Sequence, residues 1–353
     1  MIGIAVVGYG YWGPNLARCF AETEDCRVVA IADLSMNALA RASHRHPLAK
    51  MTGDWRDVIA DPRVDAVAVA TPAATHFEIA SVALRAGRHV LIEKPMANNL
   101  AHARELVDLA DRASLALMVG HTFVYSSAAR KIRELVLRRD LGKIQYYDSA
   151  RVNLGVGRHD VNVLWDLAVH DLAILRYTLP GVPVAISANG VRFDPDAPES
   201  MAHVTAYLDD GAVAHLNVNW LAPVKTRRVI IGGSQKLLLW DDLEPSEKIK
   251  VYHRRAVPTE NPSELRQALI DNRIGDMWAP HLSPTEPLMT EVEHFSDCIT
   301  RSATPITNGH FGLQIVELID AATLSMQQRG RPVELVTHYP AQPAFAAGGY
   351  NGV

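Results

Sequence analysis

The sequence predicts an α/β domain with a doubly wound parallel sheet, followed by an α+β domain with an open, mostly antiparallel sheet. Over the N-terminal third, short apolar runs alternate with helix-like segments, which is the pattern of buried parallel strands joined by helices. After about residue 122, strand-like segments follow one another with turn residues such as DDG and GGS between them, as in antiparallel sheets. The expected limits are 1–121 for the first domain, 122–330 for the second and 331–353 for a C-terminal tail.

The N-terminal third contains apolar runs that we expect to be strands, with helix-like segments between them. The expected strands are 2–8, 26–33, 64–72, 89–95 and 115–120, and the expected helices are 12–23, 36–46, 76–87 and 100–113. Each apolar run is nearly continuous, as expected for a strand that helices cover on both faces. Ligands of such sheets bind beyond the carboxyl ends of the strands, so the residues at those ends are the first candidates for a site.

The segment GYGYWG lies at the carboxyl end of the first expected strand. Its three glycines fit the pattern GxGxxG, which allows a tight turn, close approach of a pyrophosphate to backbone N–H groups, and close helix–strand contact. The pattern is informative because it follows a strand, opens a helix and precedes an acidic residue, Asp33, that ends the second strand. We therefore expect a Rossmann dinucleotide-binding fold. The expected cofactor contacts in this segment are Gly8, Gly10, Tyr11, Trp12 and Gly13.

Asp33 bears on the choice of cofactor. A carboxylate at this place accepts hydrogen bonds from both ribose hydroxyls and repels a 2′-phosphate. Leu34 and Ser35 follow it and supply no arginine to hold such a phosphate. The sequence therefore predicts NAD rather than NADP. An acid here also suits the start of the following helix, and the two roles are compatible.

Two further segments carry candidate reaction chemistry. Lys94, in EKP, lies at the carboxyl edge of the strand expected at 89–95, where it could polarise a substrate hydroxyl beside bound NAD⁺. Asp166 and His170, in WDLAVHDL, are four residues apart and would share one face of a helix. Taken alone, that spacing favours an ordinary helix ion pair. Near a dinucleotide site it also fits a proton-handling pair, with His170 as the base because imidazole titrates near neutral pH.

Four motifs, in this order, resemble those of the Gfo/Idh/MocA family of sugar and cyclitol oxidoreductases: GYGYWG, ATPAATH, EKP and the D-x-x-x-H of WDLAVHDL. The resemblance extends over roughly residues 2–330. It implies that Lys94 is the catalytic lysine, that its peptide bond to Pro95 is cis, and that Asp166 and His170 are the acid–base pair. In this reading His170 moves the proton and Asp166 orients the imidazole ring.

The remaining candidate contacts fall into two groups. The resemblance places on the nicotinamide side Thr71, Pro72, His76, Glu93 and Lys94. Candidate substrate contacts are Tyr125, Arg151, Asn153, Arg158 and Asn162. Either arginine could hold a carboxylate or pyrophosphate through bidentate hydrogen bonds, and a structural or surface role is the alternative for both.

The second domain is predicted mainly as a sheet. Expected strands are 143–155, 183–193, 201–208, 212–221, 227–233 and 236–242, and expected helices are 164–177, 286–300 and 309–328. Such a sheet has one face that solvent or a partner covers. We expect a homo-oligomer, either a dimer or a tetramer, with the sheet as a candidate interface.

The bulk properties exclude several other classes of protein. A chain of 353 residues with a net charge of −4 does not favour nucleic acid as a partner. Its three cysteines lack CxxC spacing, and nothing suggests a disulfide framework, a zinc site or metal catalysis. The N-terminus lacks a charged segment before its apolar run, and no apolar stretch approaches the roughly 20 residues of a membrane span. We expect a cytoplasmic protein without a membrane partner.

The expected function is NAD-dependent hydride transfer between nicotinamide C4 and a secondary alcohol or ketone of a sugar. Within the family the sequence looks most like the branch that oxidises nucleotide-linked 2-acetamido sugar uronates at C3. A free-sugar or inositol dehydrogenase and a C3-ketosugar reductase share much of the pattern. Two other classes stay open, namely an NAD-using glycoside-cleaving enzyme and a non-catalytic NAD-sensing regulator.

Overall fold

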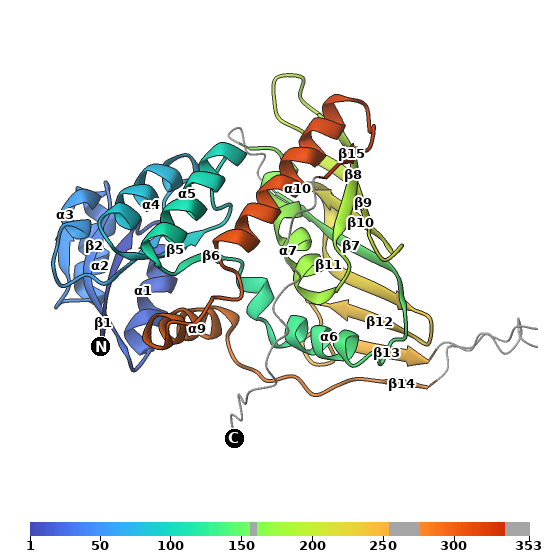
Figure 1. Cartoon of the computed structure of the whole chain (residues 1–353), viewed down its shortest axis with the longest axis horizontal. Helices are drawn as coiled ribbons and strands as arrows, with labels where there is room; N and C mark the ends of the chain where they lie inside the picture. Colours follow the sequence, from blue (N-terminus) through green and yellow to red (C-terminus); the bar gives the residue numbers. More distant parts are fainter. Residues whose placement is uncertain (156–160, 254–275, 336–353) are drawn as a thin grey trace, which may run out of the picture.

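The computed structural model describes residues 1–155, 161–253 and 276–335. Two sheets lie side by side with helices between and around them (Figure 1). In the described residues, no helix is long and apolar enough to cross a membrane. The following bounds are those of the structure.

The first sheet has six parallel strands in the order β3-β2-β1-β4-β5-β6, the doubly wound arrangement that the sequence predicted. Its strands are β1 (Ile2–Val7), β2 (Cys26–Ala32), β3 (Lys50–Thr52), β4 (Ala66–Val69), β5 (His89–Glu93) and β6 (Leu117–Gly120). Its helices are α1 (Gly13–Glu22), α2 (Met36–Arg45), α3 (Trp55–Ile59), the 3₁₀ helix η1 (Ala73–Thr75), α4 (His76–Arg85) and α5 (Leu100–Ala113). All residues of β1 are buried, as expected for a strand at the centre of such a sheet.

Three helices of this domain begin at side-chain N-caps. Ser35, Asp54 and Asn99 each accept a hydrogen bond from a backbone N–H of the first turn of α2, α3 and α5, respectively. The sequence analysis did not list β3 or α3. Both are short, and β3 has no buried residue, so no apolar run marks it.

The second sheet has nine strands in the order β14-β13-β12-β11-β7-β10-β9-β8-β15. They are β7 (Ile144–Leu154), β8 (Pro183–Val191), β9 (Met201–Leu208), β10 (Val213–Asn219), β11 (Leu221–Gly233), β12 (Lys236–Asp241), β13 (Ile249–His253), β14 (Met277–Trp278) and β15 (Val333–Glu334). Among these described strands β10 pairs with β7 in parallel and the other neighbours are antiparallel. The mostly antiparallel second sheet is therefore confirmed.

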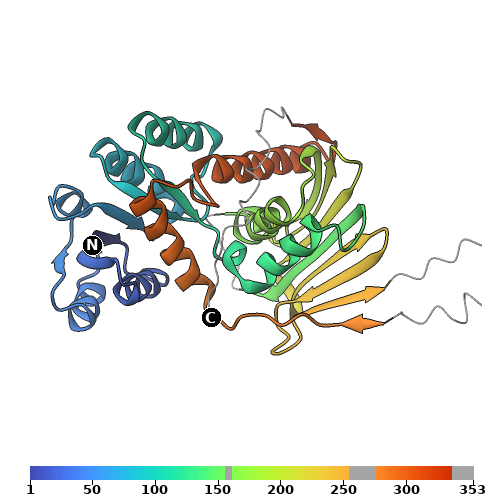
Figure 2. The same cartoon turned by 60° about the horizontal axis from the view of Figure 1, so that its bottom comes forward.

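Helices cover one face of this sheet. They are the 3₁₀ helix η2 (Thr122–Tyr125), α6 (Ser127–Leu137), the π-helix η3 (Leu164–Ala168), α7 (Val169–Thr178) and α10 (Gly309–Gln327). The remaining helix among the described residues, α9 (Pro287–Arg301), packs against α1 and η2. Figure 2 shows α6, α7 and α10 on the side of the sheet that faces the first domain. Burial alternates along β9 and β10, because their apolar residues point toward this helical layer.

The last two helices tie the second domain to the first. Helix α9 packs against α1, and Phe20 meets Phe295 edge-on at a centroid distance of 6.3 Å. Helix α10 contacts α5 and β6 at one end and β8 at the other, as its position in Figure 1 shows. The backbone of Thr307, just before α10, accepts a hydrogen bond from the N–H of Val119 in β6. The two sheets are thus held together by packing as well as by the chain that joins them.

Candidate active site

The glycine turn after β1 has the geometry that a dinucleotide needs. Gly8 has a φ of +93°, and a Cβ there would lie 2.7 Å from the carbonyl of Ala70. A Cβ on Gly13 would lie 2.0 Å from the carbonyl oxygen of Gly8. Any side chain at these two positions would force the turn and α1 away from the sheet. Gly10 borders open space, and the side chain of Tyr11 is exposed beside it.

A cavity of about 330 Å³ lies beyond the carboxyl ends of β1, β2 and β4. Its lining includes Gly8, Gly10, Asp33, Leu34, Thr71 and Pro72. Asp33 accepts hydrogen bonds from the backbone N–H groups of Tyr9 (2.5 Å) and Ser35 (2.7 Å), which fix its carboxylate at the edge of this cavity. The residues present fit the adenosine half of a dinucleotide, and Asp33 is placed where the ribose would lie. Trp12 is partly exposed and is the N-cap residue of α1.

His76 connects the two loops on the nicotinamide side. One ring nitrogen lies 2.8 Å from the carbonyl oxygen of Thr71, and the other lies 2.9 Å from that of Pro95. The ring is buried, so these contacts place His76 behind the cofactor loop rather than on its surface. Its expected cofactor contact is therefore corrected to a positioning role for Thr71 and the EKP segment. The Lys94–Pro95 peptide is cis, as the resemblance implied.

Lys94 points from the end of β5 to η3 in the second domain. Its Nζ donates a hydrogen bond to the carbonyl oxygen of Asp166 at 2.9 Å and lies 3.7 Å from Oδ1 of the same residue. The other carboxylate oxygen, Oδ2, accepts a hydrogen bond from the indole N–H of Trp220 at 3.0 Å. Asp166 therefore positions the ammonium group of Lys94, and Trp220 positions Asp166.

The expected pairing of Asp166 with His170 is not the one observed. The segment 164–168 is a π-helix, which has more residues per turn than an α-helix. Residues four apart across the junction between η3 and α7 therefore do not stand directly above one another. The carboxylate of Asp166 is turned to Lys94 and Trp220, and Nδ1 of His170 has no hydrogen-bond partner among the described residues. Aromatic packing holds the imidazole instead, because the ring of Phe123 meets it edge-on at a centroid distance of 5.0 Å.

The surroundings of His170 keep its imidazole neutral. Burial lowers its pKa well below the ordinary value of 6.5, and the positive charges of Lys94 and Arg151 lower it further. His121, close by, has its pKa lowered to about 3 by burial and by Lys94. A neutral imidazole can accept a proton, so His170 is ready to act as a base over a wide range of pH.

Two carboxyl groups lie near Lys94 in the fold: half-buried Glu93, which precedes it, and buried Glu291, which lies near Glu93. Burial raises the pKa of Glu93 to about 7. Burial, followed by the charge of Glu93, raises the pKa of Glu291 in α9 well above its ordinary value. Glu291 accepts a hydrogen bond from the hydroxyl of Thr122 at 2.7 Å. The sequence analysis missed Glu291, because only the packing of α9 against η2 brings it to the first domain.

Replacing Glu291 with glutamine is expected to change how stability depends on pH. The raised pKa means that the folded state retains a proton which the unfolded state releases above about pH 4.5. The stability that this proton contributes is full below that pH and is lost as pH rises toward the folded pKa. Glutamine is neutral at every pH. The Tm of Glu291→Gln minus that of wild type should therefore increase as pH rises, by at least about 2 °C at mildly alkaline pH.

The matched control for this prediction is Glu293→Gln, since Glu293 is exposed on the same helix. The comparison is made by thermal unfolding of the three proteins between about pH 5 and about pH 8.5, a range that begins just above the ordinary pKa of a glutamate carboxyl group. A Tm difference between Glu291→Gln and wild type that is constant across pH would contradict the prediction.

Two predicted substrate contacts are corrected by burial. Tyr125 is 1% exposed, and its hydroxyl lies 2.8 Å from the hydroxyl of Thr307. Arg151 forms a buried ion pair with Asp171, with 2.7 Å between Nε and Oδ2 and 3.4 Å between Nη2 and Oδ1. Both side chains already bind protein partners and are closed to solvent.

The other three predicted substrate contacts are Asn153, Asn162 and Arg158. Oδ1 of Asn162 accepts hydrogen bonds from the backbone N–H groups of Leu164 and Trp165, so this side chain caps the start of the helix. Asn153 is half-buried near the end of β7. Arg158 lies outside the described residues.

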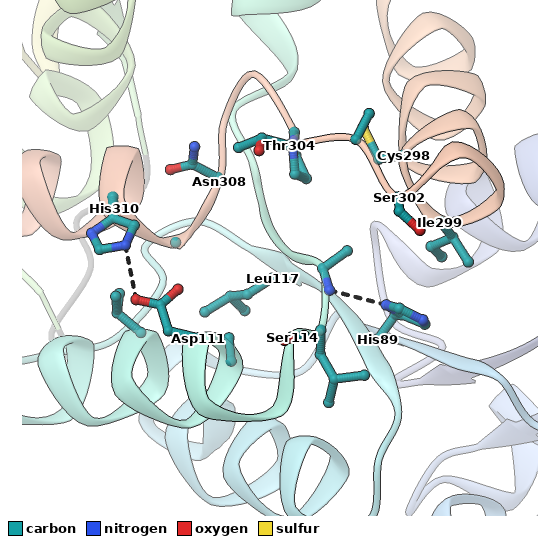
Figure 3. Close-up of a pocket in the computed structure, with 17 residues that line it drawn as sticks. His89, Asp111, Ser114, Leu117, Cys298, Ile299, Ser302, Thr304, Asn308 and His310 are labelled. Carbon is teal, nitrogen blue, oxygen red and sulfur yellow. Dashed lines mark hydrogen bonds and ion pairs between the residues drawn. The ribbon is translucent and has the colours of Figure 1, made fainter. Parts of the chain in front are cut away.

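A second cavity lies at the opposite edge of the parallel sheet, beside the first residue of β5 and the start of α10. It has a volume of about 360 Å³ (Figure 3). Its polar groups bind the protein itself: His310 lies 3.0 Å from Asp111, and Nδ1 of His89 accepts the backbone N–H of Ala116. The residues of the reaction site do not line it. In the described residues, no group of three His, Cys, Asp or Glu side chains could hold a metal ion.

Comparison with known proteins decides the family. Residues 2–121 match the Gfo/Idh/MocA oxidoreductase family with its NAD-binding Rossmann fold. Residues 129–238 match the C-terminal domain of the same family, so the two matches together span more than half of the chain. The chain belongs to the Gfo/Idh/MocA family. It is therefore an oxidoreductase with an NAD-binding Rossmann domain, as the four motifs predicted.

Relatives within the Gfo/Idh/MocA family differ in substrate. UDP-N-acetylglucosamine 3-dehydrogenase from Acidithiobacillus ferrooxidans is 28% identical over 254 residues, which are 72% of this chain and 76% of that protein. Myo-inositol 2-dehydrogenase from Thermotoga maritima is 24% identical over 347 residues, which are 94% of this chain and 98% of that protein. A solved structure of the Acidithiobacillus enzyme has a TM-score of 0.79 at 24% identity and covers 93% of this chain and 99% of its own, which shows the shared fold.

Proposed function

We propose that this protein is an NAD(H)-dependent dehydrogenase that interconverts a secondary alcohol and a ketone on a sugar. The observation that carries the proposal is the contact of Lys94 with Asp166 at the carboxyl end of β5, with His170 near enough for the charge of Lys94 to lower its pKa, in a domain whose cavity fits a dinucleotide. Bound NAD⁺ would supply the acceptor for the hydride. The ammonium group of Lys94 would stabilise negative charge on the substrate oxygen, and neutral His170 would take the hydroxyl proton.

A nucleotide-linked sugar oxidised at C3 is our first candidate for the substrate. It is supported by the resemblance of WDLAVHDL and its flanking sequence to that branch and by the relative that is named for UDP-N-acetylglucosamine. The relative that acts on myo-inositol supports the broader class of sugars and polyols. The homo-oligomer and the cytoplasmic location stay predictions.

A substrate panel tests this proposal. Nucleotide sugars, free sugars and inositols are each offered with NAD⁺, and the absorbance of NADH is followed. We expect NADH from at least one nucleotide sugar. Cleavage of a glycosidic bond without net NADH would replace the proposal with the glycoside-cleaving alternative, and NAD binding without turnover of any kind would replace it with the regulator.

The preference for NAD over NADP is a separate prediction. The carboxylate of Asp33 would repel a 2′-phosphate, and the neighbouring Leu34, which is 90% exposed, offers no cation to hold it. We expect kcat/KM with NAD⁺ to exceed that with NADP⁺ by about tenfold or more, the effect of about 1.4 kcal/mol. Leu34→Arg should lower the ratio of kcat/KM with NAD⁺ to kcat/KM with NADP⁺, because arginine binds phosphate well. Equal kcat/KM values for the two cofactors in wild type would contradict the prediction.

A further inference from the structure

Two arginines face each other across neighbouring strands beside His170. Arg151 in β7 and Arg227 in β11 are direct cross-strand partners. Their guanidinium carbons lie 4.6 Å and 5.3 Å from the ring centroid of Phe123, and the same ring meets His170 edge-on. Both positive charges and the predicted base therefore contact the same aromatic ring. Like charges at directly opposite positions destabilise a sheet, so this arrangement calls for a compensating negative charge.

Asp171 compensates the positive charge of Arg151 fully, whereas Asp242 compensates that of Arg227 only in part. Arg151 is 7% exposed and binds both carboxylate oxygens of Asp171. Arg227 is 34% exposed, and its partner Asp242 lies 3.6 Å away. Asp242 is also shared with Lys248, whose Nζ lies 3.4 Å from its Oδ1. These three cations and two carboxylates leave one net positive charge, and Arg227 is the partly exposed cation of the cluster that lies against Phe123.

The lowered pKa of Arg227 also indicates that its positive charge is only partly compensated. Burial lowers it, and the charge of Arg151 lowers it further, although Asp242 acts in the opposite direction. The guanidinium group is therefore less well compensated in the protein than it would be in water. An anion that reached it would find a preformed, partly dehydrated cation with hydrogen-bond donors to offer.

We infer that Arg227 selects substrates that carry an anionic group, a carboxylate or a phosphate, close to the carbinol that reacts. This inference rests on the proposed function and names the substrate class of the same site. The guanidinium would bind the anionic oxygens, while Lys94 and His170 act on the hydroxyl. A neutral sugar would leave the charge of Arg227 uncompensated and would bind less tightly.

The test compares neutral and anionic forms of one sugar. Glucose, glucuronate and glucose phosphate form the series with a neutral member. UDP-N-acetylglucosamine, which already carries a diphosphate, and its uronate form a second series that differs only by the carboxylate. Arg227→Gln should raise KM for the anionic substrates by about 10- to 100-fold, the loss expected for a hydrogen bond between charged groups. The KM of Arg227→Gln for the neutral sugar should stay within about twofold of the wild-type value, because no hydrogen bond between charged groups is lost there. Arg227→Lys keeps the positive charge but lacks the planar guanidinium group. Its KM for the anionic substrates should therefore lie between those of wild type and Arg227→Gln.

The matched control is the next residue along β11. Arg228 points to the opposite face of the sheet and pairs with Asp241 at 2.8 Å, with 50% of its side chain exposed. Arg228→Gln makes the same change of net charge and should leave both KM values unchanged. A shift confined to glucuronate would identify a carboxylate as the anion, and a shift confined to the phosphate would identify a phosphate.

Two outcomes would overturn the inference. Equal losses for neutral and anionic sugars in Arg227→Gln would show a structural role, and equal effects of Arg227→Gln and Arg228→Gln would show long-range electrostatics only. If sugars are oxidised normally and neither KM responds to Arg227→Gln, this inference fails while the proposed function stands. If no sugar in either series reduces NAD⁺, both fail together.

Discussion

Replacing Lys94 with alanine is expected to lower kcat by about 10² or more while NAD⁺ still binds. The ammonium group is held between the carbonyl oxygen and the carboxylate of Asp166, at the end of β5 nearest the reaction site. It is the cation best placed to stabilise an oxyanion as the hydroxyl loses its proton. Alanine removes that charge and its contacts with Asp166.

The measurement is steady-state turnover together with NAD⁺ titration by protein fluorescence. Lys131→Ala is a suitable control, since Lys131 also pairs with a carboxylate, that of Glu134 at 2.6 Å, and lies in α6. Turnover of Lys94→Ala within about twofold of wild type would exclude the role assigned to Lys94, because the loss expected from this chemistry is far larger. Loss of NAD⁺ binding in parallel with turnover would assign Lys94 to cofactor binding instead.

Replacing His170 with alanine is expected to lower kcat/KM by a factor of about 10² to 10⁴, the range for loss of a general base. It should also alter the pH profile. In wild type the base must be neutral, so kcat/KM falls as pH drops through the pKa of His170. Since burial and the charge of Lys94 lower that pKa, the acid limb should lie below pH 6.5. His170→Ala should lose this limb.

His310→Ala is the control for this substitution, because His310 is 60% exposed and lies by the second cavity. It should change neither the rate nor the pH profile. An acid limb that persists unchanged in His170→Ala would mean that another group titrates in wild type.

The sequence predicted much of the fold, because local patterns encode it. The expected helix at 309–328 is α10, Gly309–Gln327, and the expected strand at 201–208 is β9, Met201–Leu208. The glycine turn was also predictable, since the positive φ at Gly8 and the close contact at Gly13 leave few other residue types possible. The short β3 carries no buried residue, and a pattern of burial could not mark it.

The candidate site was less predictable, because its contacts join segments that are far apart in the chain. Lys94 meets Asp166 across 72 positions, and Trp220 reaches Asp166 from the bend between β10 and β11. The spacing of Asp166 and His170 suggested one face of an α-helix, and the π-helix redirects the carboxylate to Lys94. The sequence analysis named Arg151 and not Arg227, because the pairing of Arg151 with buried Asp171 and the weaker pairing of Arg227 with Asp242 appear only in the fold.

The central claim is direct hydride transfer between a sugar carbinol carbon and the nicotinamide, with Lys94 and His170 acting on the hydroxyl. The most direct measurement uses the sugar that the panel identifies, deuterated at every ring carbon, in a single turnover with NAD⁺. The account predicts that the NADH formed carries deuterium at C4 and that neither Lys94→Ala nor His170→Ala forms it at a comparable rate. NADH without deuterium, or deuterated NADH formed by both variants at the wild-type rate, would contradict it.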